Sequence, residues 1–438
     1  MKKVALHNLG CKVNSYETDA MQELLEQNGY QIVPFKEGAD IYIINTCTVT
    51  NMADRKSRQM LHKAKKMNPD AVVIAAGCYV QVRDGAEVDE SIDLIIGNNK
   101  KNELIQILNN YFEQRENHTN TVENITENTV IDLVEQTDYE NLQISKTTEH
   151  TRAYLKVQDG CNQFCSYCVI PFARGRIRSR RLEDVLVEVE TLAKNGYQEV
   201  VLTGIHLSSY GVDLTGQREL LQLITTVHQV DGIQRIRLGS LEPRIITEEF
   251  VKHLVKLPKV CAHFHLSLQS GCDTVLRRMN RKYTSQEYLE ACQLLRAYYD
   301  RVMFTTDIIV GFPGETEEEF QVTKKFVEKI GFYETHIFKY SKREGTKAAS
   351  MENQVDERIK AQRSAEMIQL NEKSQRKIDE SLQGIEVSVL LEEEIRIDEK
   401  QYLVGHTQEY VKIAVLVDTN KINKIIYTTI GANSQIIH

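Results

Sequence analysis

The sequence predicts an α/β protein in three parts: an N-terminal open parallel α/β sheet domain, a central partial (β/α)6 barrel and a small C-terminal β-barrel of OB-like kind. Short apolar runs alternate with helical patterns over roughly the first hundred residues. The alternation resumes between residues 153 and 340, and the end of the chain holds only short strand-like runs. We therefore divide the chain into four segments: residues 1–112, a polar linker or insertion at 113–148, residues 149–372 and residues 373–438.

Length and composition fit packed domains. The chain has 438 residues, 41% of them hydrophobic, and a formal net charge of −8. No run approaches the roughly 18 apolar residues of a membrane span, and the first residues turn polar too early for a secretory signal. We therefore expect a cytoplasmic protein with no membrane partner. The acidic balance argues against a general nucleic-acid binder, but basic islands at residues 55–66, 174–181 and 277–283 allow a locally basic face.

Three cysteines recur at equivalent places in the N-terminal part. Apolar runs at residues 4–9, 39–46, 71–77 and 91–97 predict parallel strands, and helical patterns at residues 18–29 and 55–67 predict helices that join them. Cys11, Cys47 and Cys78 each come just after one of the apolar runs. Since the carboxyl ends of parallel strands share one edge of an open sheet, we expect the three thiols to meet there. Each one alone could also be an ordinary buried cysteine that packs as a small hydrophobe.

The rest of the chain divides in the same way. Residues 113–148 are rich in Asn, Thr and Glu and lack periodicity, which is typical of a linker or a partly ordered insertion. Six strand-like runs then suit a partial barrel: residues 153–158, 198–204, 235–240, 263–271, 303–314 and 335–340. One long polar helix is expected at residues 355–381. The last strands are expected at residues 386–393, 402–407, 410–417 and 424–430.

The run at residues 263–271 has a polar face. Alternation puts His263, His265, Ser267 and Gln269 on one side of the strand and apolar residues on the other. The apolar side would pack on helices, so the polar side would line the lumen. Ser267 and Gln269 lie nearer the carboxyl end and are candidate cofactor contacts. The two histidines could instead be satisfied core residues.

Cys161, Cys165 and Cys168 have the spacing CxxxCxxC, just after a predicted strand. Three thiolates would leave one iron of a cubic 4Fe-4S cluster without a protein ligand, because such a cluster normally takes four cysteines. The alternative is a zinc site with a fourth ligand elsewhere, although zinc sites usually show paired CxxC halves. The chain has nine cysteines, an odd number, and a reducing compartment favours metal binding over disulfides.

The segment CNQFCSYC, residues 161–168, resembles the cluster motif of the radical S-adenosylmethionine superfamily. Around the other cysteines, LGCKVNSYETD, NTCTVTNMADRKSRQ and GCYVQ resemble the N-terminal domain of its methylthiotransferase branch, and the C-terminal strands resemble the TRAM module of that branch. The resemblance covers nearly the whole chain except residues 113–148. It implies S-adenosylmethionine as cofactor and two 4Fe-4S clusters, one held by Cys161, Cys165 and Cys168 and one by Cys11, Cys47 and Cys78.

The resemblance also implies a mechanism. One electron from the first cluster cleaves S-adenosylmethionine and gives a 5'-deoxyadenosyl radical, while a second S-adenosylmethionine methylates a sulfur carried by the auxiliary cluster. Tyr167 would lie near the adenine of the cofactor. Thr203 and Gly204 would take the place of the family's Gly-Gly-Glu contact. An electron donor such as flavodoxin or ferredoxin and a sulfur source would be further partners.

Short sequence motifs distinguish the three substrate types of this branch. GCKVNSYET, TCTVTNMADRKSRQ and MNRKYT resemble the enzymes that act on threonylcarbamoyladenosine in tRNA. The isopentenyladenosine enzymes usually read GCQMN at the first cysteine, and those acting on a ribosomal-protein aspartate read LGCPKN. We expect N6-threonylcarbamoyladenosine at position 37, in the tRNA anticodon stem-loop, to be converted to its 2-methylthio derivative. The other two substrates, and a non-catalytic iron-sulfur RNA-binding protein, are the alternatives.

Five arginines follow the cysteine motif, at positions 174, 176, 178, 180 and 181. We predict that Arg174, Arg176, Arg178 and Arg180 contact the substrate. Guanidinium groups suit both the carboxylate of the threonylcarbamoyl group and RNA phosphate. The alternative for each of them is a solvated or salt-bridged place in a basic loop.

Overall fold

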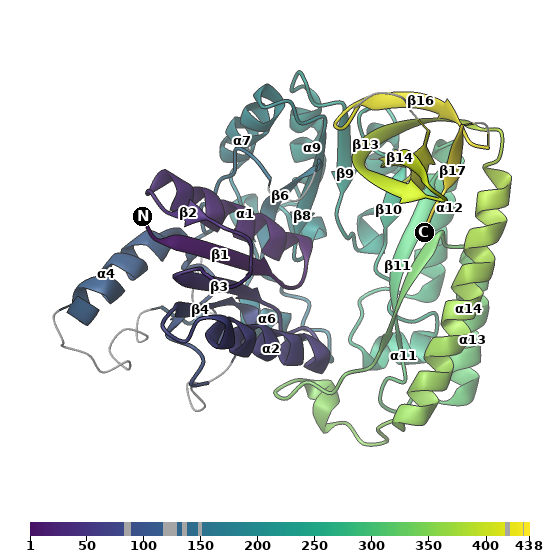
Figure 1. The fold of residues 1–438 in the computed structure, drawn as a ribbon. Helices are drawn as coiled ribbons and strands as arrows, with labels where there is room; N and C mark the ends of the chain where they lie inside the picture. Colours follow the sequence, from purple (N-terminus) through teal and green to yellow (C-terminus); the bar gives the residue numbers. More distant parts are fainter. Residues whose placement is uncertain (83–88, 117–128, 134–137, 148–150, 417–420, 432) are drawn as a thin grey trace.

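The computed structural model describes residues 1–82, 89–116, 129–133, 138–147, 151–416, 421–431 and 433–438. The N-terminal sheet lies beside the central strands, and the C-terminal sheet lies against their other side, next to the long helix α14 (Glu357–Ser381) (Figure 1). Within the described ranges, none of the helices combines the length and the apolar character that crossing a membrane requires.

Five parallel strands form the N-terminal sheet, in the order β2-β1-β3-β4-β5. They are β1 (Lys3–Asn8), β2 (Gln31–Ile32), β3 (Ile41–Thr46), β4 (Val72–Gly77) and β5 (Leu94–Ile96). The helices of this part are α1 (Lys12–Gln27), α2 (Asn51–Met67), α3 (Cys78–Gln81), α4 (Leu104–Glu116) and the 3-10 helix η1 (Lys101–Glu103). Leu25 and Leu108 pack α1 and α4 on one face, and Leu61 packs α2 on the other. The predicted open parallel sheet is confirmed, and its strands are apolar because both faces are covered.

Six parallel strands and one short antiparallel strand form the central part, in two sheets. One sheet has the order β7-β6-β8-β9 and the other β10-β11-β12. The strands are β6 (Ala153–Asp159), β7 (Arg178–Ser179), β8 (Glu199–Gly204), β9 (Arg235–Leu238), β10 (His263–His265), β11 (Met303–Val310) and β12 (Glu334–Lys339). The short β7 alone runs antiparallel to its neighbour. Single parallel bridges, Ile236 with Val260 and Leu241 with Leu266, connect the two sheets.

The central helices pack outside these strands. They are α6 (Ile170–Arg174), α7 (Leu182–Lys194), α8 (Val212–Thr215), α9 (Leu220–His228), α10 (Glu248–Leu254), α11 (Asp273–Arg278), α12 (Ser285–Tyr298) and α13 (Glu317–Ile330), with 3-10 helices η2 (Leu207–Ser209), η3 (Pro243–Ile245) and η4 (Lys347–Ser350). Thr284 and Thr316 begin α12 and α13 with complete capping boxes, which satisfy the free N–H groups of the first turn. Val189, Leu223 and Leu295 bury the apolar sides of α7, α9 and α12 in one core.

One predicted strand is shorter than its sequence pattern. Regular pairing of β10 ends at His265, and the rest of the run at 263–271 contributes only single bridges at Leu266 and Gln269. The backbone of Gln269 has a φ of +68°, a left-handed conformation that a continuous strand does not contain. The polar residues beyond His265 therefore lie on a loop at the carboxyl end of the strand.

An antiparallel sheet ends the chain, in the order β16-β13-β14-β15-β17. Its strands are β13 (Glu386–Ile397), β14 (Lys400–Thr407), β15 (Lys412–Val415), β16 (Ile425–Thr429) and β17 (Ser434–Ile436). The sheet curls with a register shift between Leu391 and Glu393, and its core also takes in Met303 and Tyr333 from the central part. The C-terminal sheet is thus packed on the central strands and not tethered loosely to them.

The predicted linker at 113–148 lies partly outside the described residues. Its described part packs against the domains on either side. Leu142 and Ile144 belong to the central core, and the Tyr139 hydroxyl donates a hydrogen bond to the carbonyl of Lys156 at 2.8 Å. These described residues therefore belong to the folded body of the protein.

Candidate active site

The first cysteine set lies on the loop between β6 and α6. The Cys161 N–H donates to the carbonyl of Gly175 at 3.0 Å, and the Cys168 N–H donates to the carbonyl of Cys165 at 2.9 Å. Gly160 is required at the start of this loop, because its φ is +69° and a Cβ would lie 1.7 Å from the carbonyl oxygen of Arg176. The loop therefore folds back tightly and carries all three thiols at the carboxyl end of the first central strand.

The surroundings of these sulfur atoms suit metal ligands. The Sγ of Cys165 accepts a hydrogen bond from Arg281 Nη1 at 3.3 Å, and the Sγ of Cys161 accepts one from the Gln163 N–H at 3.5 Å. Burial raises the pKa of Cys161 to about 11 and that of Cys168 to about 12, so without a metal they are neutral thiols at pH 7. A metal cluster would deprotonate them, and hydrogen bonds to cluster sulfurs are an ordinary feature of such sites.

The second cysteine set is brought together by the N-terminal sheet. Cys47 follows β3 directly, Cys78 begins α3 directly after β4, and Cys11 is the N-cap residue of α1 after β1. These three strands are neighbours in the sheet, so their carboxyl ends meet at one edge. A Cβ on Gly10 would lie 3.1 Å from Cys47 Sγ, which shows how closely the Cys11 loop passes over that thiol. The three thiols are also close enough to influence one another's ionisation.

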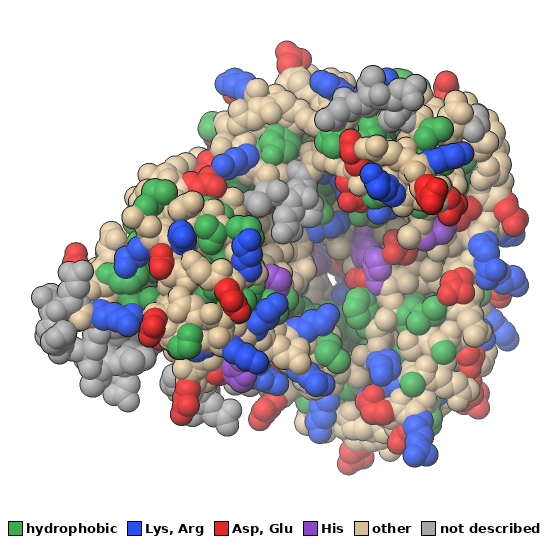
Figure 2. Space-filling model, viewed as in Figure 1, with side chains coloured by type: hydrophobic (Ala, Val, Ile, Leu, Met, Phe, Trp, Pro, Cys, Tyr) green, Lys and Arg blue, Asp and Glu red, His purple; other side chains and the backbone are tan. Residues whose placement is uncertain are grey.

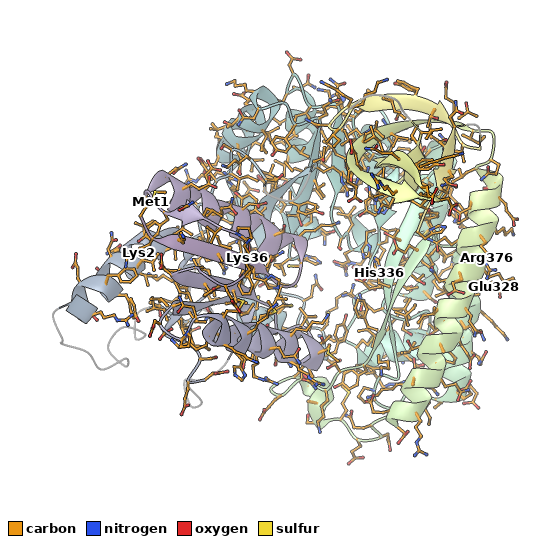
Figure 3. The ribbon with its side chains drawn as sticks, in the orientation of Figure 1. Met1, Lys2, Lys36, Glu328, His336 and Arg376 are labelled. Atoms are coloured by element: carbon orange, nitrogen blue, oxygen red, sulfur yellow. The ribbon has the colours of Figure 1, made fainter. Side chains whose placement is uncertain are left out.

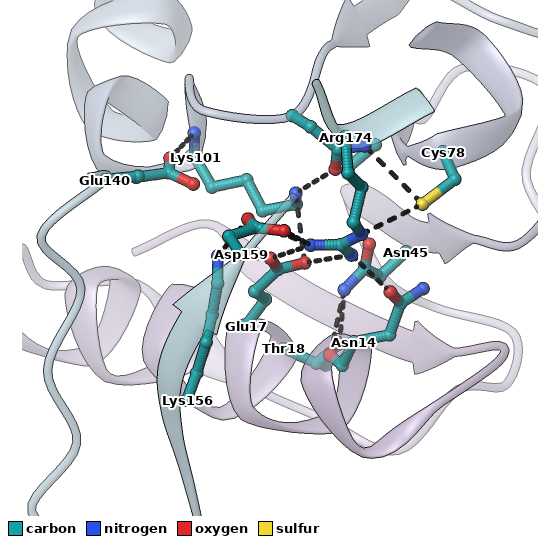
Figure 4. Close-up of polar contacts among 12 residues, drawn as sticks. Asn14, Glu17, Thr18, Asn45, Cys78, Lys101, Glu140, Lys156, Asp159 and Arg174 are labelled. Atoms are coloured by element: carbon teal, nitrogen blue, oxygen red, sulfur yellow. Dashed lines mark hydrogen bonds and ion pairs between the residues drawn. The ribbon is translucent and has the colours of Figure 1, made fainter. Parts of the chain in front are cut away.

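A buried ionic network connects the two sets (Figure 4). Arg174, the last residue of α6 after the first-set loop, donates from Nε to Cys78 Sγ at 3.3 Å. Its Nη1 lies 2.7 Å from Glu17 Oε1 and 3.2 Å from Asp159 Oδ2. Lys156 Nζ bridges the same two carboxylates at 2.8 and 2.7 Å. Glu17 stands on α1 and Asp159 ends β6, so the network fixes the N-terminal sheet against the central strands.

The charges of this network favour an anion beside Cys78. Burial opposes ionisation of Glu17, but the charges of Arg174, Lys101 and Lys156 hold its pKa well below its usual range. The described charged groups in and next to the network are four cations (Lys101, Lys156, Arg174 and Arg178) and three carboxylates (Glu17, Glu140 and Asp159), which leaves one positive charge over. Thiolate ligands of a cluster at the second set would offset that charge, so the residues present fit such a group.

Three of the four predicted substrate arginines are inside the protein. Arg174 is held as just described, Arg178 donates to the carbonyl of Arg174 at 2.9 Å, and Arg180 forms an ion pair with Glu188. All three are almost completely buried. They hold the structure together and do not face a substrate, because ion pairs and hydrogen bonds within the fold already engage their guanidinium groups. Arg176 is exposed and lies over the Phe164 ring, 4.7 Å from its centroid.

Of the predicted cofactor contacts, Tyr167 lies within the first set, and the others lie at or just after the carboxyl ends of β8 and β10. Tyr167 packs edge-on against Phe312 with ring centroids 6.5 Å apart. Thr203 and Gly204 end β8, and a Cβ on Gly204 would lie 2.8 Å from Gln158 Oε1. The carbonyl of Ser267 accepts hydrogen bonds from Arg281 and from Tyr283. Gln269 holds the chain in line with β11, since its N–H donates to the carbonyl of Asp307 at 2.8 Å.

Two residues near the first set were not among the sequence predictions. Arg281 joins Cys165 to Ser267, as described above. Glu242 is buried after β9, where its Oε2 lies 3.3 Å from His206 Nε2 and accepts a hydrogen bond from Gln163 Nε2 at 3.4 Å. Both stand in the segments SLEPR and MNRKY, which are polar pieces directly after a strand or helix. That position could have identified both as candidate site residues, because ligands bind at the carboxyl ends of parallel strands.

Comparison with known proteins agrees with this site. The Radical SAM superfamily model matches residues 155–327, and the model of Uncharacterized protein family UPF0004 matches residues 3–97. The threonylcarbamoyladenosine tRNA methylthiotransferase MtaB of Bacillus subtilis is 40% identical over 429 residues, covering 97% of this chain and 93% of that protein. A tRNA-2-methylthio-N(6)-dimethylallyladenosine synthase of Carboxydothermus hydrogenoformans is 35% identical over 406 residues, covering 91% of this chain and 90% of that protein.

The fold has a solved counterpart. The radical S-adenosylmethionine methyltransferase TsrM of Kitasatospora setae superimposes with a TM-score of 0.58 at 17% identity, covering 80% of this chain and 77% of that one. At this identity the likeness concerns the fold alone. The full-length similarity to the curated relatives goes further, and the two family models span the residues of both cysteine sets. This chain therefore belongs to the radical S-adenosylmethionine methylthiotransferase family.

Proposed function

We propose that this protein converts N6-threonylcarbamoyladenosine, at position 37 beside the tRNA anticodon, to its 2-methylthio derivative. The observation that carries the proposal is the pair of three-cysteine sets, which one buried network holds on neighbouring elements. Two such sets suit a reaction that needs both a radical source and a sulfur carrier. The name of the Bacillus subtilis relative, at 40% identity, supports the choice of nucleoside.

In this proposal the cysteines hold two 4Fe-4S clusters. Cys161, Cys165 and Cys168 hold the cluster that, when S-adenosylmethionine is bound, supplies the electron for its reductive cleavage. Arg281 keeps Cys165 in place through its 3.3 Å hydrogen bond, and Glu242 offers a carboxylate to the polar part of the cofactor. The remaining cofactor contacts are Tyr167, Thr203, Gly204, Ser267 and Gln269. Cys11, Cys47 and Cys78 hold the auxiliary cluster.

The proposed domains follow the sheets. Residues 1–112 form the methylthiotransferase domain and 113–148 an insertion. Residues 149–372 form the radical S-adenosylmethionine barrel, in which the six parallel strands make a partial (β/α)6 barrel, and residues 373–438 form the TRAM domain. The last boundary falls within α14, so the helix belongs to both neighbours.

RNA binding is assigned to the exposed surfaces. Tyr427 on β16 is 74% exposed, and two exposed lysines, Lys421 and Lys424, shortly precede it in the chain. An exposed ring with cations beside it suits stacking on an unpaired base of the anticodon stem-loop. Arg176, stacked on Phe164 near the first set, is the one predicted substrate arginine that we retain. A tRNA substrate also places the protein in the cytoplasm, where an electron donor such as flavodoxin or ferredoxin and a sulfur source complete the reaction.

Mass spectrometry of nucleosides tests the proposal. The anaerobically reconstituted protein is given S-adenosylmethionine, a reductant and one of three anticodon stem-loops, which carry threonylcarbamoyladenosine, dimethylallyladenosine or unmodified adenosine at position 37. The expected result is methylthiolation of the first RNA and little or none of the other two. Equal modification of the unmodified RNA would contradict the proposal, and preference for the dimethylallyl RNA would favour the other named relative's substrate.

A further inference from the structure

A group of ionisable side chains outside the cysteine sets faces the space between the N-terminal sheet and the central strands. His265, Asp307 and His336 stand on β10, β11 and β12, and their ligand atoms all lie within 4.8 Å of one another. The strand register explains this, because Asp307 is the direct neighbour of His336 and Thr305 that of His265. Figure 2 shows histidine, lysine and arginine side chains round a hollow in this face, and Figure 3 labels His336 in the middle of the same view.

Hydrogen bonds hold this face in one arrangement. The Nδ1 of His265 lies 3.0 Å from Thr305 Oγ1, and its Nε2 lies 3.3 Å from Asp307 Oδ2. The same hydroxyl of Thr305 lies 3.0 Å from His263 Nε2, so it can donate to one imidazole and accept from the other. The exposed ring of His336 stacks on His265 with centroids 5.8 Å apart. The Nδ1 of His336 also lies 3.7 Å from Glu334 Oε1. The face therefore offers imidazole nitrogens beside two carboxylates, of which Asp307 is held by His265.

A lysine from the N-terminal part faces this space. Lys12 is the first residue of α1, and its charge acts on both Asp307 and His263. In the part of the chain that the structure describes, no residue forms a hydrogen bond or an ion pair with the Lys12 side chain, although Glu199 and Tyr410 are close enough to act on its charge. It is half-buried. A partly buried cation without a partner favours an anionic ligand.

The neighbouring cations are already paired. Arg152 Nε lies 3.1 Å from Glu392, and Arg237 Nε lies 2.7 Å from Glu199. Both guanidinium groups are close enough to repel Lys12. Arg235 lies 3.6 Å from the same Glu199, so three guanidinium groups share two carboxylates. Lys12 adds a further positive charge to this side of the hollow.

We infer that Lys12 and the His265, Asp307 and His336 face select a nucleoside whose N6 substituent carries a carboxylate. The inference rests on the proposed function, since it states how the same site recognises its substrate. Lys12 binds the carboxylate, His336 adds a donor, and Asp307 accepts from an N–H or O–H of the substituent. A hydrocarbon substituent leaves the partly buried Lys12 ammonium without an anion, and a polar group left unpaired in this way discriminates strongly between substrates.

The position of Lys12 also orients the substrate. Lys12 follows Cys11 directly, so the carboxylate and the second cysteine set are held by the same loop. Binding of the substituent at Lys12 thereby brings the adenine base to the second set. Binding energy from the substituent, which does not itself react, then orients the reacting carbon. Such orientation raises the reaction rate and not only the affinity.

Two imidazoles and one carboxylate are also a ligand set for a divalent metal ion. The charge of Lys12 opposes a cation there and favours an anion. A bound metal is therefore the outcome that the experiment must separate from carboxylate recognition.

The experiment removes the negative charge of the substrate carboxylate and, separately, the positive charge of Lys12. Two stem-loop RNAs carry threonylcarbamoyladenosine as the free acid or as its methyl ester, and the full-length reconstituted protein is assayed for RNA affinity and for kcat/KM. We expect the wild-type protein to prefer the acid by about 10- to 100-fold, the range of a charge-assisted contact. Lys12→Met should remove most of that preference and Lys12→Arg should keep it. His336→Gln should reduce it by a smaller factor.

The control is Lys329→Met, which removes an exposed lysine on the outer helix α13 and should keep the full preference. Retention of the acid preference by Lys12→Met would overturn the inference. Stoichiometric binding of Mn²⁺ to the reconstituted protein, lost in Asp307→Asn, would overturn it too and assign the face to a metal. If the wild-type protein methylthiolated neither RNA, the proposed function would fail, which is a different result.

Discussion

The two cysteine sets are assembled in different ways, one within a single loop and the other from three separate strand ends. Cys161, Cys165 and Cys168 lie on one loop within eight residues, where local hydrogen bonds and Gly160 determine the shape. Cys11, Cys47 and Cys78 come from three strand ends and meet only because β1, β3 and β4 are neighbours. The first site therefore depends on the conformation of one loop, and the second depends on the order of strands in the sheet.

The difference shows why one arginine occupies the place between them. Arg174 ends α6, the helix that follows the first-set loop, and contacts Cys78 of the second set, while Glu17 and Asp159 both pair with its guanidinium. A change in the loop should leave the sheet intact. A change in the Glu17 network should disturb the relation between the sets. The predictions below separate these cases.

The largest effect is expected at the first set. Replacing Cys161, Cys165 or Cys168 by Ala should abolish both 5'-deoxyadenosine formation and methylthiolation, because two thiolates do not hold a cluster that normally takes at least three from this loop. Chromatography of the reaction mixture measures both products. Cys292→Ala, a buried cysteine on α12 outside both sets, is the control and should keep both activities. Normal 5'-deoxyadenosine formation in a first-set variant would contradict the assignment.

A narrower loss is expected at the second set. Replacing Cys11, Cys47 or Cys78 by Ala should abolish the methylthio product and leave part of the 5'-deoxyadenosine formation. The reason is that the first-set loop does not depend on these side chains for its own hydrogen bonds. The two products are measured in the same samples. Methylthiolation at near wild-type yield would show that these cysteines are ordinary strand-end residues.

The network between the sets should matter for stability. Glu17→Gln leaves Arg174, Lys101 and Lys156 short of one buried carboxylate and should lower the free energy of unfolding by about 3–5 kcal/mol. Urea denaturation of the metal-free protein measures it. Glu26→Gln on the same helix removes an exposed ion pair with Lys146 and should cost at most about 1 kcal/mol. Equal costs for the two variants would mean that the network contributes no more than a surface pair.

At the interface with the C-terminal sheet, the contribution of Glu199 to the free energy of unfolding should depend on pH. Burial opposes ionisation of Glu199, but Arg237 and Arg152 lower its pKa from 4.5 to about 2. A depressed pKa stabilises the fold above about pH 4.5, and this contribution is lost as the pH falls towards 2. It amounts to about 3 kcal/mol at neutral pH.

Unfolding measured between pH 5 and pH 3 tests this. The free energy of unfolding should fall less steeply with decreasing pH in Glu199→Gln than in the wild-type protein. Parallel slopes for the two proteins would show that Glu199 does not titrate in the folded state at an altered pKa.

Much of the architecture was predictable, because strand and helix patterns are local. Four strands of the N-terminal sheet, the six parallel central strands and four of the C-terminal strands lie where the apolar runs predicted them, whereas the short β2 and β17 were not predicted. The meeting of Cys11, Cys47 and Cys78 was predictable as well, since strand ends share an edge. The length of β10 was not, because the left-handed backbone of Gln269 has no signal in an alternating pattern.

The arginines show what sequence alone cannot supply. Arg174 and Arg180 looked like substrate contacts because their partners, Glu17 for one and Glu188 for the other, are known as partners only in the folded chain. A weak signal existed in Lys156, a charged residue within an apolar strand, which indicates a buried ion pair. The same reasoning could have selected Lys12, a lysine directly after a candidate cluster ligand, but only the fold brings its charge near enough to help lower the pKa of Asp307.

The central claim is that the loop and the sheet edge each hold a cluster of their own. Iron and sulfide analysis of the anaerobically reconstituted protein, with two triple variants, tests it most directly. The wild-type protein should hold about eight iron atoms per chain, as two 4Fe-4S clusters require. The variant with Cys161, Cys165 and Cys168 replaced by Ala and the variant with Cys11, Cys47 and Cys78 replaced by Ala should each hold about four. About four irons in the wild-type protein, or zinc at either set, would contradict the account.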